Sequence, residues 1–311
     1  MDDYLLEPPL ADYVRQSGAF NAPNNSIQAR RDTFARACQY FTPETPSGIT
    51  IRDQQLGDLA VRLYIPVGVS PSSGFPAVLY LHGGGWSMGS HTTHDWFAFA
   101  LLKREQFAIV AVDYRLAPEH PFPAPLEDAL RVWDAMKNGT WPEIDSHRLA
   151  VAGDSAGGSL AAGLCVELKA TGMQQPLLQA LVYPVLSASS ELDSMQRHAQ
   201  APMLTTSGFF ESLEGHLPSH HLKTDPRALP LLQQSVTNLA PAFIGVAQYD
   251  PLFDHGVAYA RRLQGAGVPT HLHIGEGLVH ASLRASGVPA VEAFYDALAG
   301  ALGAALASTT I

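Results

Sequence analysis

The sequence predicts an α/β fold in which a mostly parallel central sheet is flanked by helices. Two observations predict it: short, mostly apolar runs recur along the chain, and helical patterns fill the gaps between them. An apolar run without polar alternation is typical of a strand buried on both faces, as in parallel sheets. The apolar runs lie at residues 77–81, 107–112, 149–152, 178–183 and 243–247, and a sixth strand is expected at 270–274. The helical patterns lie at 94–105, 125–137, 156–170, 255–266 and 288–307.

Composition limits the classes of function. The 311 residues are 46% hydrophobic and 15% charged, which suits a sizeable core. The net charge of −10 disfavours phosphate backbones and anionic lipid surfaces, so we expect no nucleic-acid and no membrane partner. Residues 290–307 are rich in Ala and Leu, but Glu292 and Asp296 interrupt them, which favours a packing helix over a membrane span.

Cysteine usage and the first residues bear on location. Cys38 and Cys165 are far apart and have no metal-like spacing, so we expect no disulfide framework and no metal. The chain opens with Asp2 and Asp3 and no long apolar run, unlike a secretory signal. Both features favour a cytoplasmic location.

We expect two segments outside the regular alternation to form a cap. Residues 1–45 look helical and amphipathic, with a break at 21–24. They precede an α/β domain at 46–311, which opens with a hairpin turn at Gly57 and Asp58 followed by an alternating strand at 59–65. Residues 185–240 contain no apolar strand, and insertions of this length often serve as lids or binding elements. The alternative is a surface excursion without a role.

The strongest chemical motif is Gly-Asp-Ser-Ala-Gly-Gly at residues 153–158. It follows an apolar run and precedes a helical pattern, which is the strand–turn–helix context that Gly-x-Ser-x-Gly requires. Glycines let the neighbouring chains pass, and the serine oxygen then projects near free N–H groups at the start of a helix. We therefore predict that Ser155 is a nucleophile.

A second glycine-rich motif, His-Gly-Gly-Gly-Trp, follows the apolar run at 77–81. Acyl transfer places negative charge on a tetrahedral oxygen, which needs N–H donors aimed at it. We predict that the amides of Gly83, Gly84 and Ala156 form this oxyanion hole. A phosphate-binding loop is the alternative, but the Lys and Ser/Thr of a P-loop are missing.

A serine nucleophile needs a base, and in this context the chain order is Ser, acid, His. Asp250 directly follows an apolar run, and His280 follows the last predicted strand, in a predicted loop with Gly275 and Gly277. We predict that His280 is the general base and that Asp250 orients it. Glu276 could be the acid instead, but it precedes His280 in the same predicted loop, and Asp254 could cap the next helix. The other histidines have structural explanations, namely His82, His91, His94, His220, His221, His271 and His273.

Large apolar residues near these motifs are candidates for the substrate pocket, although each could equally belong to the core. They are Trp86, Met203, Leu204, Phe209 and Phe210.

Together the motifs resemble the hormone-sensitive-lipase-like esterases, also called bacterial family IV, within the α/β-hydrolase fold. Residues 82–86 resemble the oxyanion motif of that family, and 153–158 resemble its nucleophile elbow. Residues 114–123, Tyr-Arg-Leu-Ala-Pro-Glu-His-Pro-Phe-Pro, look like its long signature, which we interpret as structural, and Asp-Pro-Leu at 250–252 looks like its acid motif. The chain departs from the family pattern at Ser159, at 253–256, and at Ala281 and Ser282.

The resemblance implies hydrolysis of short- to medium-chain acyl esters, no cofactor, an N-terminal helical cap and a possible homodimer. Two alternatives remain open. An amidase or peptidase could use the same triad. A non-catalytic small-molecule receptor could use the same fold, although receptors that resemble this family lack the base histidine.

Overall fold

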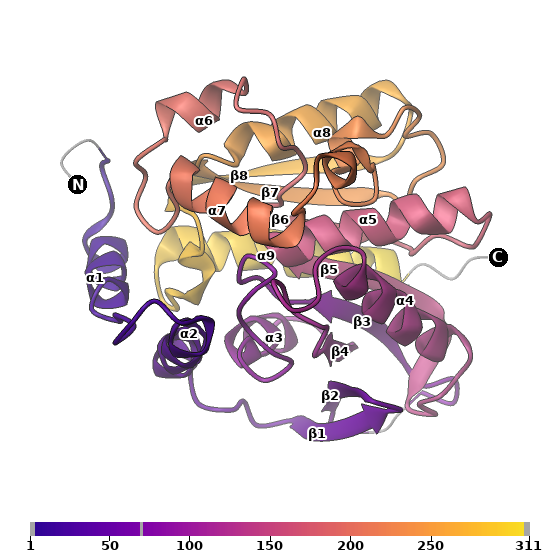
Figure 1. Ribbon diagram of the computed structural model, residues 1–311. Coiled ribbons are helices and arrows are strands. Elements are labelled where there is room, and N and C mark those ends of the chain that lie inside the picture. Colours follow the sequence, from indigo (N-terminus) through magenta and orange to yellow (C-terminus); the bar gives the residue numbers. More distant parts are fainter. Residues whose placement is uncertain (1–3, 69–70, 308–311) are drawn as a thin grey trace.

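The computed structural model describes residues 4–68 and 71–307, and a single sheet of eight strands crosses this part of the chain (Figure 1). Its order is β1-β2-β4-β3-β5-β6-β7-β8, and the strands from β4 to β8 are parallel neighbours. The predicted mostly parallel sheet is confirmed. The strands are β1 (Ile49–Leu56), β2 (Leu59–Pro66), β3 (Phe75–Leu81), β4 (Ala108–Val112), β5 (Ile144–Asp154), β6 (Gln179–Val182), β7 (Ala242–Tyr249) and β8 (Thr270–Val279).

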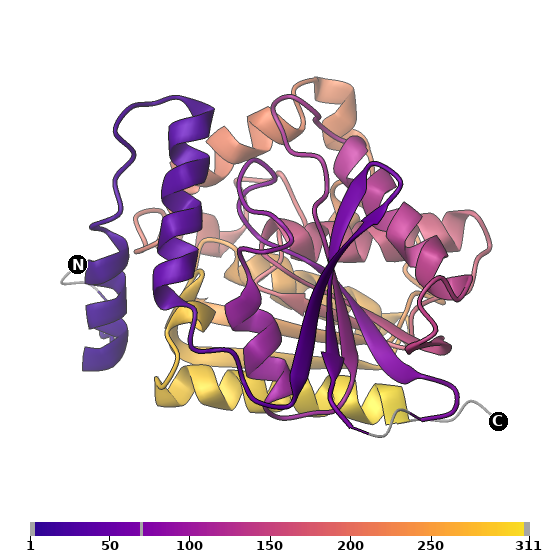
Figure 2. The same ribbon diagram turned by 90° about the horizontal axis from the view of Figure 1, so that it is seen from below.

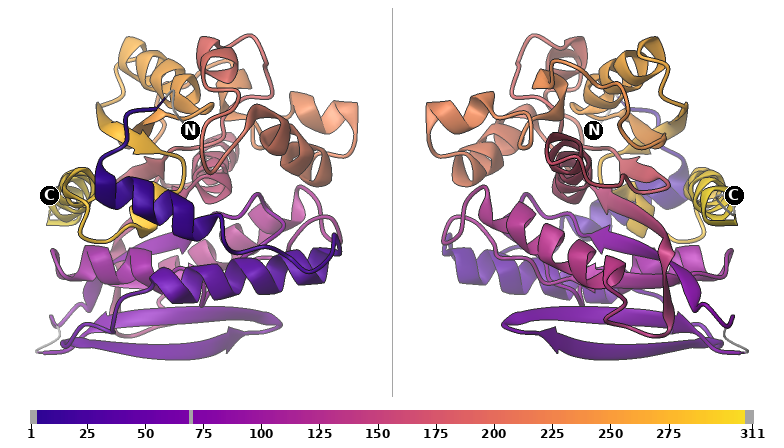
Figure 3. Two further views of the ribbon diagram at one scale, coloured as in Figure 1. Left: turned by 90° about the vertical axis from the view of Figure 1, so that its left-hand side faces the viewer. Right: turned by 90° about the vertical axis from the view of Figure 1, so that its right-hand side faces the viewer.

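The first two strands form an antiparallel hairpin at one edge of the sheet, seen at the bottom of Figure 3. Gly57 and Asp58 make its two-residue turn, since Leu56 pairs with Leu59. Gly57 has a φ of 67°, a conformation that glycine adopts without steric cost. The predicted turn is therefore confirmed.

Helices cover both faces of the sheet, which is why the central strands β3 and β4 are apolar and buried throughout. Helices α4 (Ala124–Lys137), α5 (Ala156–Ala170) and α8 (Phe253–Gly265) pack on the face that contains Leu79 and Val151. Helices α3 (Asp95–Leu102) and α9 (Pro289–Ala307) pack on the face that contains Val78 and Ala150. Figure 2 shows α9 in yellow along the lower edge, beside α3.

Helix α9 is long and apolar enough, by length and composition alone, to cross a membrane. In the structure it lies along β5, β7 and β8, and Phe294, Leu298 and Leu302 on its inner face are buried. The helix therefore packs on the sheet, as the acidic interruptions at Glu292 and Asp296 predict.

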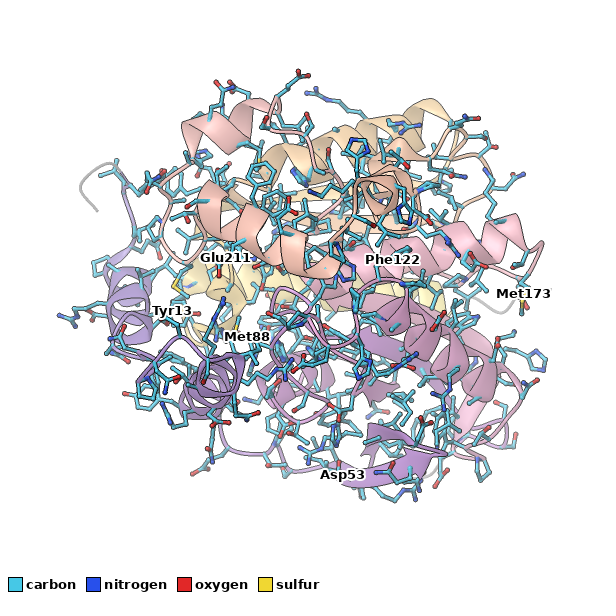
Figure 4. The ribbon with its side chains drawn as sticks, viewed as in Figure 1. Tyr13, Asp53, Met88, Phe122, Met173 and Glu211 are labelled. Atoms are coloured by element: carbon cyan, nitrogen blue, oxygen red, sulfur yellow. The ribbon has the colours of Figure 1, made fainter. Side chains whose placement is uncertain are left out.

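The two segments that the sequence predicts as a cap contain helices and loops, and no strand, within the described residues. Helices α1 (Pro8–Ser17) and α2 (Ile27–Phe41) lie together at one side, facing the viewer in the left half of Figure 3. The later segment holds α6 (Asp193–Arg197), α7 (Thr206–His216) and the short helices η1 (His220–Thr224) and η2 (Pro230–Leu232). Glu211 of α7, labelled in Figure 4, accepts Arg30 Nη1 of α2 at 3.0 Å, so the two segments touch.

One predicted boundary is wrong. Strand β8 extends to Val279, so Gly275 and Gly277 lie inside the strand and not in a loop. The extension is held from β7, where Gln248 Oε1 accepts the N–H of Gly277 at 2.7 Å. A register shift in β7 just beyond Ala247 marks an irregularity that local periodicity does not reveal.

Candidate active site

Ser155 lies at the sharp turn between β5 and α5, where φ is 53° and ψ is −117°. A non-glycine residue there is strained, and such strain is typical of functional sites. The flanking glycines are sterically required: a Cβ on Gly153 would lie 2.2 Å from the oxygen of Gly157, and a Cβ on Gly157 would lie 1.9 Å from the oxygen of Leu81. The turn therefore needs both glycines to present the Ser155 hydroxyl.

Three side chains from distant parts of the sequence meet in a hydrogen-bonded row. His280 Nε2 lies 2.9 Å from Ser155 Oγ, and His280 Nδ1 lies 2.7 Å from Asp250 Oδ2. Asp250 is fully buried, and its other oxygen accepts the N–H of Leu252 at 2.8 Å. The row has the geometry of a nucleophile, a base and an orienting acid.

The rival acids lie elsewhere. Asp254 Oδ2 accepts the N–H of Ser194 at 2.8 Å and so holds the start of α6 against α8. Glu276 is exposed on β8. Neither carboxylate is hydrogen-bonded to His280 within the described residues.

The prediction that the Gly83 amide belongs to the oxyanion hole is wrong. Gly83 donates its N–H to Asp154 Oδ1 at 2.9 Å, so this amide is not free to bind an oxyanion. Gly84, Gly85 and Ala156 line the cavity beside Ser155, and Gly83 does not. Among the described residues, no acceptor is recorded for the N–H groups of these three. The amide of Gly85 therefore lies beside the cavity, whereas that of Gly83 does not.

His82 begins the glycine loop and is held in place by contacts with Tyr114. Its ring stacks on Tyr114 with centroids 4.2 Å apart, and Tyr114 donates its hydroxyl to the His82 carbonyl at 2.6 Å. Burial lowers the pKa of His82 to about 4, so the ring is neutral near pH 7. This agrees with the predicted structural role.

A cavity of about 250 Å³ opens at Ser155 and His280. Four of the five predicted pocket residues line it, namely Trp86, Met203, Leu204 and Phe209. The prediction for Phe210 is wrong: its side chain packs on the core and on the ring of Phe209, with centroids 4.9 Å apart. Consecutive helical residues point in different directions, so only one of this pair can face the cavity.

Sequence reasoning missed several lining residues. Phe34 comes from α2, and Arg284 ends the short helix η3 (Ser282–Arg284) that follows His280. Tyr183 lies at the end of β6 with its ring 4.7 Å from that of His280. The other missed lining residues are Met88, His94, Trp96, Val185, Ser212, Leu252 and Ala281.

The N-terminal helices are tied to this cavity by polar contacts. Arg31 of α2 binds both oxygens of Glu119, at 2.9 and 2.6 Å. Its Nε also donates to the carbonyl of Ser87, close to the glycine loop, at 2.8 Å. In α1, Tyr13 donates its hydroxyl to the carbonyl of Ala281, next to the base histidine, at 2.8 Å.

Two further features of the surroundings bear on chemistry. No group of three or more His, Cys, Asp or Glu side chains in residues 4–68 and 71–307 is arranged to hold a metal ion.

A larger open hollow of about 860 Å³ lies between α1 and the segment around α6, and Met203 borders both it and the smaller cavity. No triad residue lines that hollow.

Known proteins resemble this chain over most of its length. A family described as alpha/beta hydrolase fold matches residues 78–284. An ethyl acetate hydrolase of Pseudomonas putida is 39% identical over 295 residues, covering 90% of this chain and 92% of that protein. Carboxylesterase NlhH of Mycobacterium tuberculosis is 37% identical over 259 residues, covering 79% and 80%.

Among solved structures, a thermostable esterase from Pseudomonas putida superimposes with a TM-score of 0.90 at 28% identity, covering 98% of both chains. The chain therefore belongs to the alpha/beta-hydrolase family, in the hormone-sensitive-lipase-like group of esterases that its motifs resemble.

Proposed function

We propose that the chain hydrolyses carboxylic esters of short to medium acyl chains through an acyl-enzyme formed on Ser155. The observation that carries the proposal is the row of contacts from Ser155 Oγ through His280 to Asp250, at 2.9 and 2.7 Å. A hydroxyl is a weak nucleophile until an adjacent base accepts its proton, and this row supplies the base.

In the first step Ser155 Oγ attacks the ester carbonyl while His280 Nε2 takes the hydroxyl proton. Asp250 stabilises the imidazolium that forms. The amides of Gly84, Gly85 and Ala156 are the proposed donors to the oxyanion, because they line the cavity beside Ser155. His280 then protonates the departing alcohol, and water hydrolyses the acyl-enzyme by the same route in reverse.

The size of the cavity supports small substrates. Its volume of about 250 Å³ lies just below the usual range for drug-sized ligands. The relative that is named an ethyl acetate hydrolase fits the same size class.

The test is a panel of p-nitrophenyl acetate, butanoate and octanoate with wild type, Ser155→Ala and His280→Ala. We expect kcat to fall by roughly 10⁴ to 10⁶ in both variants. Ser207→Ala, an exposed serine on α7, is the matched control and should keep wild-type rates. Near-normal turnover by Ser155→Ala would exclude the proposal.

Two further assays separate the alternatives. Faster cleavage of p-nitroacetanilide than of p-nitrophenyl acetate would favour the amidase. A wild-type protein that turns over neither substrate and reacts with no fluorophosphonate would favour the receptor.

A further inference from the structure

Arg284 is a buried cation at the active site. It ends helix η3, four positions after His280, and only 8% of its surface is exposed. It borders the cavity that contains Ser155. A guanidinium stays protonated at every pH at which proteins fold, so this charge is permanent.

The immediate partners of this guanidinium are uncharged. Nη1 points to Cys38 Sγ at 3.6 Å, and the group lies 5.6 Å from the ring centre of Phe34. Burial raises the pKa of the Cys38 thiol, which therefore stays neutral. Burial also raises the pKa of Tyr13, whose hydroxyl already donates to the carbonyl of Ala281.

No carboxylate neutralises the charge at close range. Within residues 4–68 and 71–307, Arg284 forms no ion pair with an Asp or Glu, and the groups that chiefly interact with its charge are Tyr13, Cys38 and Tyr183. Asp154 borders the same cavity and interacts with Arg284 only at longer range, while its carboxylate accepts the hydroxyl of Tyr80 and the amide of Gly83. A buried charge without a paired counter-charge is unfavourable, so an anion that could reach it would bind.

The unpaired nitrogens can be reached. Within the described residues Nε and Nη2 of Arg284 form no hydrogen bond of good geometry, although the Tyr13 hydroxyl interacts with the same guanidinium. Neither nitrogen is enclosed without a partner, and the side chain borders the Ser155 cavity as well as two further hollows beside Phe41. A donor of Arg284 that faces the Ser155 cavity is therefore available to a molecule bound there. A planar guanidinium presents such donors as a fork that fits a carboxylate.

We propose that Arg284 selects esters that carry a carboxylate in addition to the ester bond, and binds that carboxylate while Ser155 attacks the ester carbonyl. The rest of the lining favours a single negative charge. His94, a second basic residue beside the cavity, is buried, and burial holds its pKa well below the usual value, so it adds no positive charge. One cation matches a monoanionic carboxylate better than a phosphate dianion.

This inference rests on the proposed ester hydrolysis. Measurements on the wild-type protein alone distinguish a failure of the Arg284 proposal from a failure of the proposed ester hydrolysis. Hydrolysis at neutral pH is followed by pH-stat for two matched pairs: monomethyl glutarate against methyl glutaramate, and acetoxyacetate against acetoxyacetamide. Each pair differs by a carboxylate against an uncharged amide of the same shape. The first carries the group on the acyl side and the second on the alcohol side.

We expect kcat/KM to favour the acid over the amide by tenfold or more in at least one pair, and that pair identifies the side that faces Arg284. Hydrolysis of the amides with no preference for either acid would overturn the selection by Arg284 and leave the esterase intact. If the protein hydrolyses none of the four esters and also fails to hydrolyse p-nitrophenyl acetate, the result contradicts the proposed ester hydrolysis itself.

Variants then tie the preference to this side chain. Arg284→Met should lower the acid-to-amide ratio by roughly 30-fold or more, as expected when one member of a buried charged pair is removed. Arg284→Lys keeps the charge without the fork and should recover part of the ratio. Arg30→Gln removes an exposed positive charge from α2 and should leave the ratio unchanged, which excludes general electrostatic attraction.

If Arg284→Met does not fold, competition in wild type decides. Glutarate monoamide should inhibit hydrolysis of p-nitrophenyl acetate competitively, at a concentration at least tenfold below that of glutaramide. Equal inhibition by the acid and the diamide would overturn the proposal.

Discussion

The amide of Gly83 and the carboxylate of Asp154, 71 positions apart in the chain, are joined by a hydrogen bond of 2.9 Å. Asp154 immediately precedes the nucleophile, and Gly83 precedes the amides that face the cavity. The bond therefore fixes the glycine loop relative to Ser155. Tyr80 completes the arrangement by donating its hydroxyl to the same carboxylate oxygen at 2.6 Å.

Removing this carboxylate should reduce turnover more than binding. In Asp154→Ala the glycine loop loses its link to the nucleophile turn, and we expect kcat to fall by about 10²-fold with a smaller change in KM. Tyr80→Phe removes only the second hydrogen bond and should cost less than tenfold. Steady-state kinetics with p-nitrophenyl butanoate measures both, and a wild-type kcat in Asp154→Ala would show that the loop holds its position without this bond.

The closeness of α5 to β3 predicts that Gly157 tolerates no side chain. A Cβ there would overlap the carbonyl oxygen of Leu81 at 1.9 Å, so Gly157→Ala should lose about 3 kcal/mol or more of unfolding free energy, and with it activity. Gly300→Ala in α9 is the control, since a Cβ there meets no described atom within 4 Å beyond its own stretch of helix and should stabilise by roughly 0.5 kcal/mol. Urea unfolding compares the two, and equal stability would contradict the packing described.

The contacts of Arg31 predict that α2 contributes to substrate binding. Arg31→Gln removes the two-pronged ion pair with Glu119 and the contact with Ser87, so α2 should separate more easily from the glycine loop. We expect KM to rise several-fold with a smaller loss of kcat. Within the described part of the chain the Arg36 side chain is hydrogen-bonded only to Thr33, so Arg36→Gln on the same helix should behave as wild type. An unchanged KM in Arg31→Gln would mean that α2 closes the cavity without this anchor.

Buried neutral histidines predict that stability falls in mild acid. Burial lowers the pKa of His216 to about 3 and those of His82 and His255 to about 4. Below pH about 6.5 the unfolded chain gains protons that the folded protein does not bind, so unfolding free energy falls with pH, by up to roughly 1.4 kcal/mol per pH unit for each histidine. Urea unfolding between pH 6.5 and 5 measures this slope.

A single substitution should reduce that slope. His216→Phe keeps a ring against Trp86, which His216 stacks on at 4.3 Å, and removes one site of proton uptake. We expect the slope to fall by about 1 kcal/mol per pH unit, while His220→Gln at an exposed position leaves it unchanged. Identical slopes in wild type and His216→Phe would contradict a neutral buried His216.

Much of the fold can be predicted from the sequence, because a strand buried on both faces is recognisable from its run of apolar residues. Runs such as 77–81 and 149–152 are wholly apolar because alternate residues pack against opposite helical layers. The positions of Asp250 and His280 follow from chain order and from the ends of strands, where sites form in parallel sheets.

The sequence does not show in which direction an individual amide or side chain points, or which distant residue it contacts. The amide of Gly83 turns toward Asp154 because of a contact that spans much of the chain, and residue type does not record it. Phe209 and Phe210 are identical in type, and only the orientation of α7, which begins after its N-cap Thr205, decides which one faces the cavity. Nothing around Arg284 in the sequence separates a buried arginine from an exposed one.

The most direct test of the central claim is the titration of wild type with a fluorophosphonate, followed by intact and peptide mass spectrometry. The account predicts one adduct per chain, located on Ser155, with loss of p-nitrophenyl butanoate turnover in proportion to labelling, and no adduct in Ser155→Ala. Full inactivation with the label on another residue, or turnover that survives complete labelling of Ser155, would contradict it.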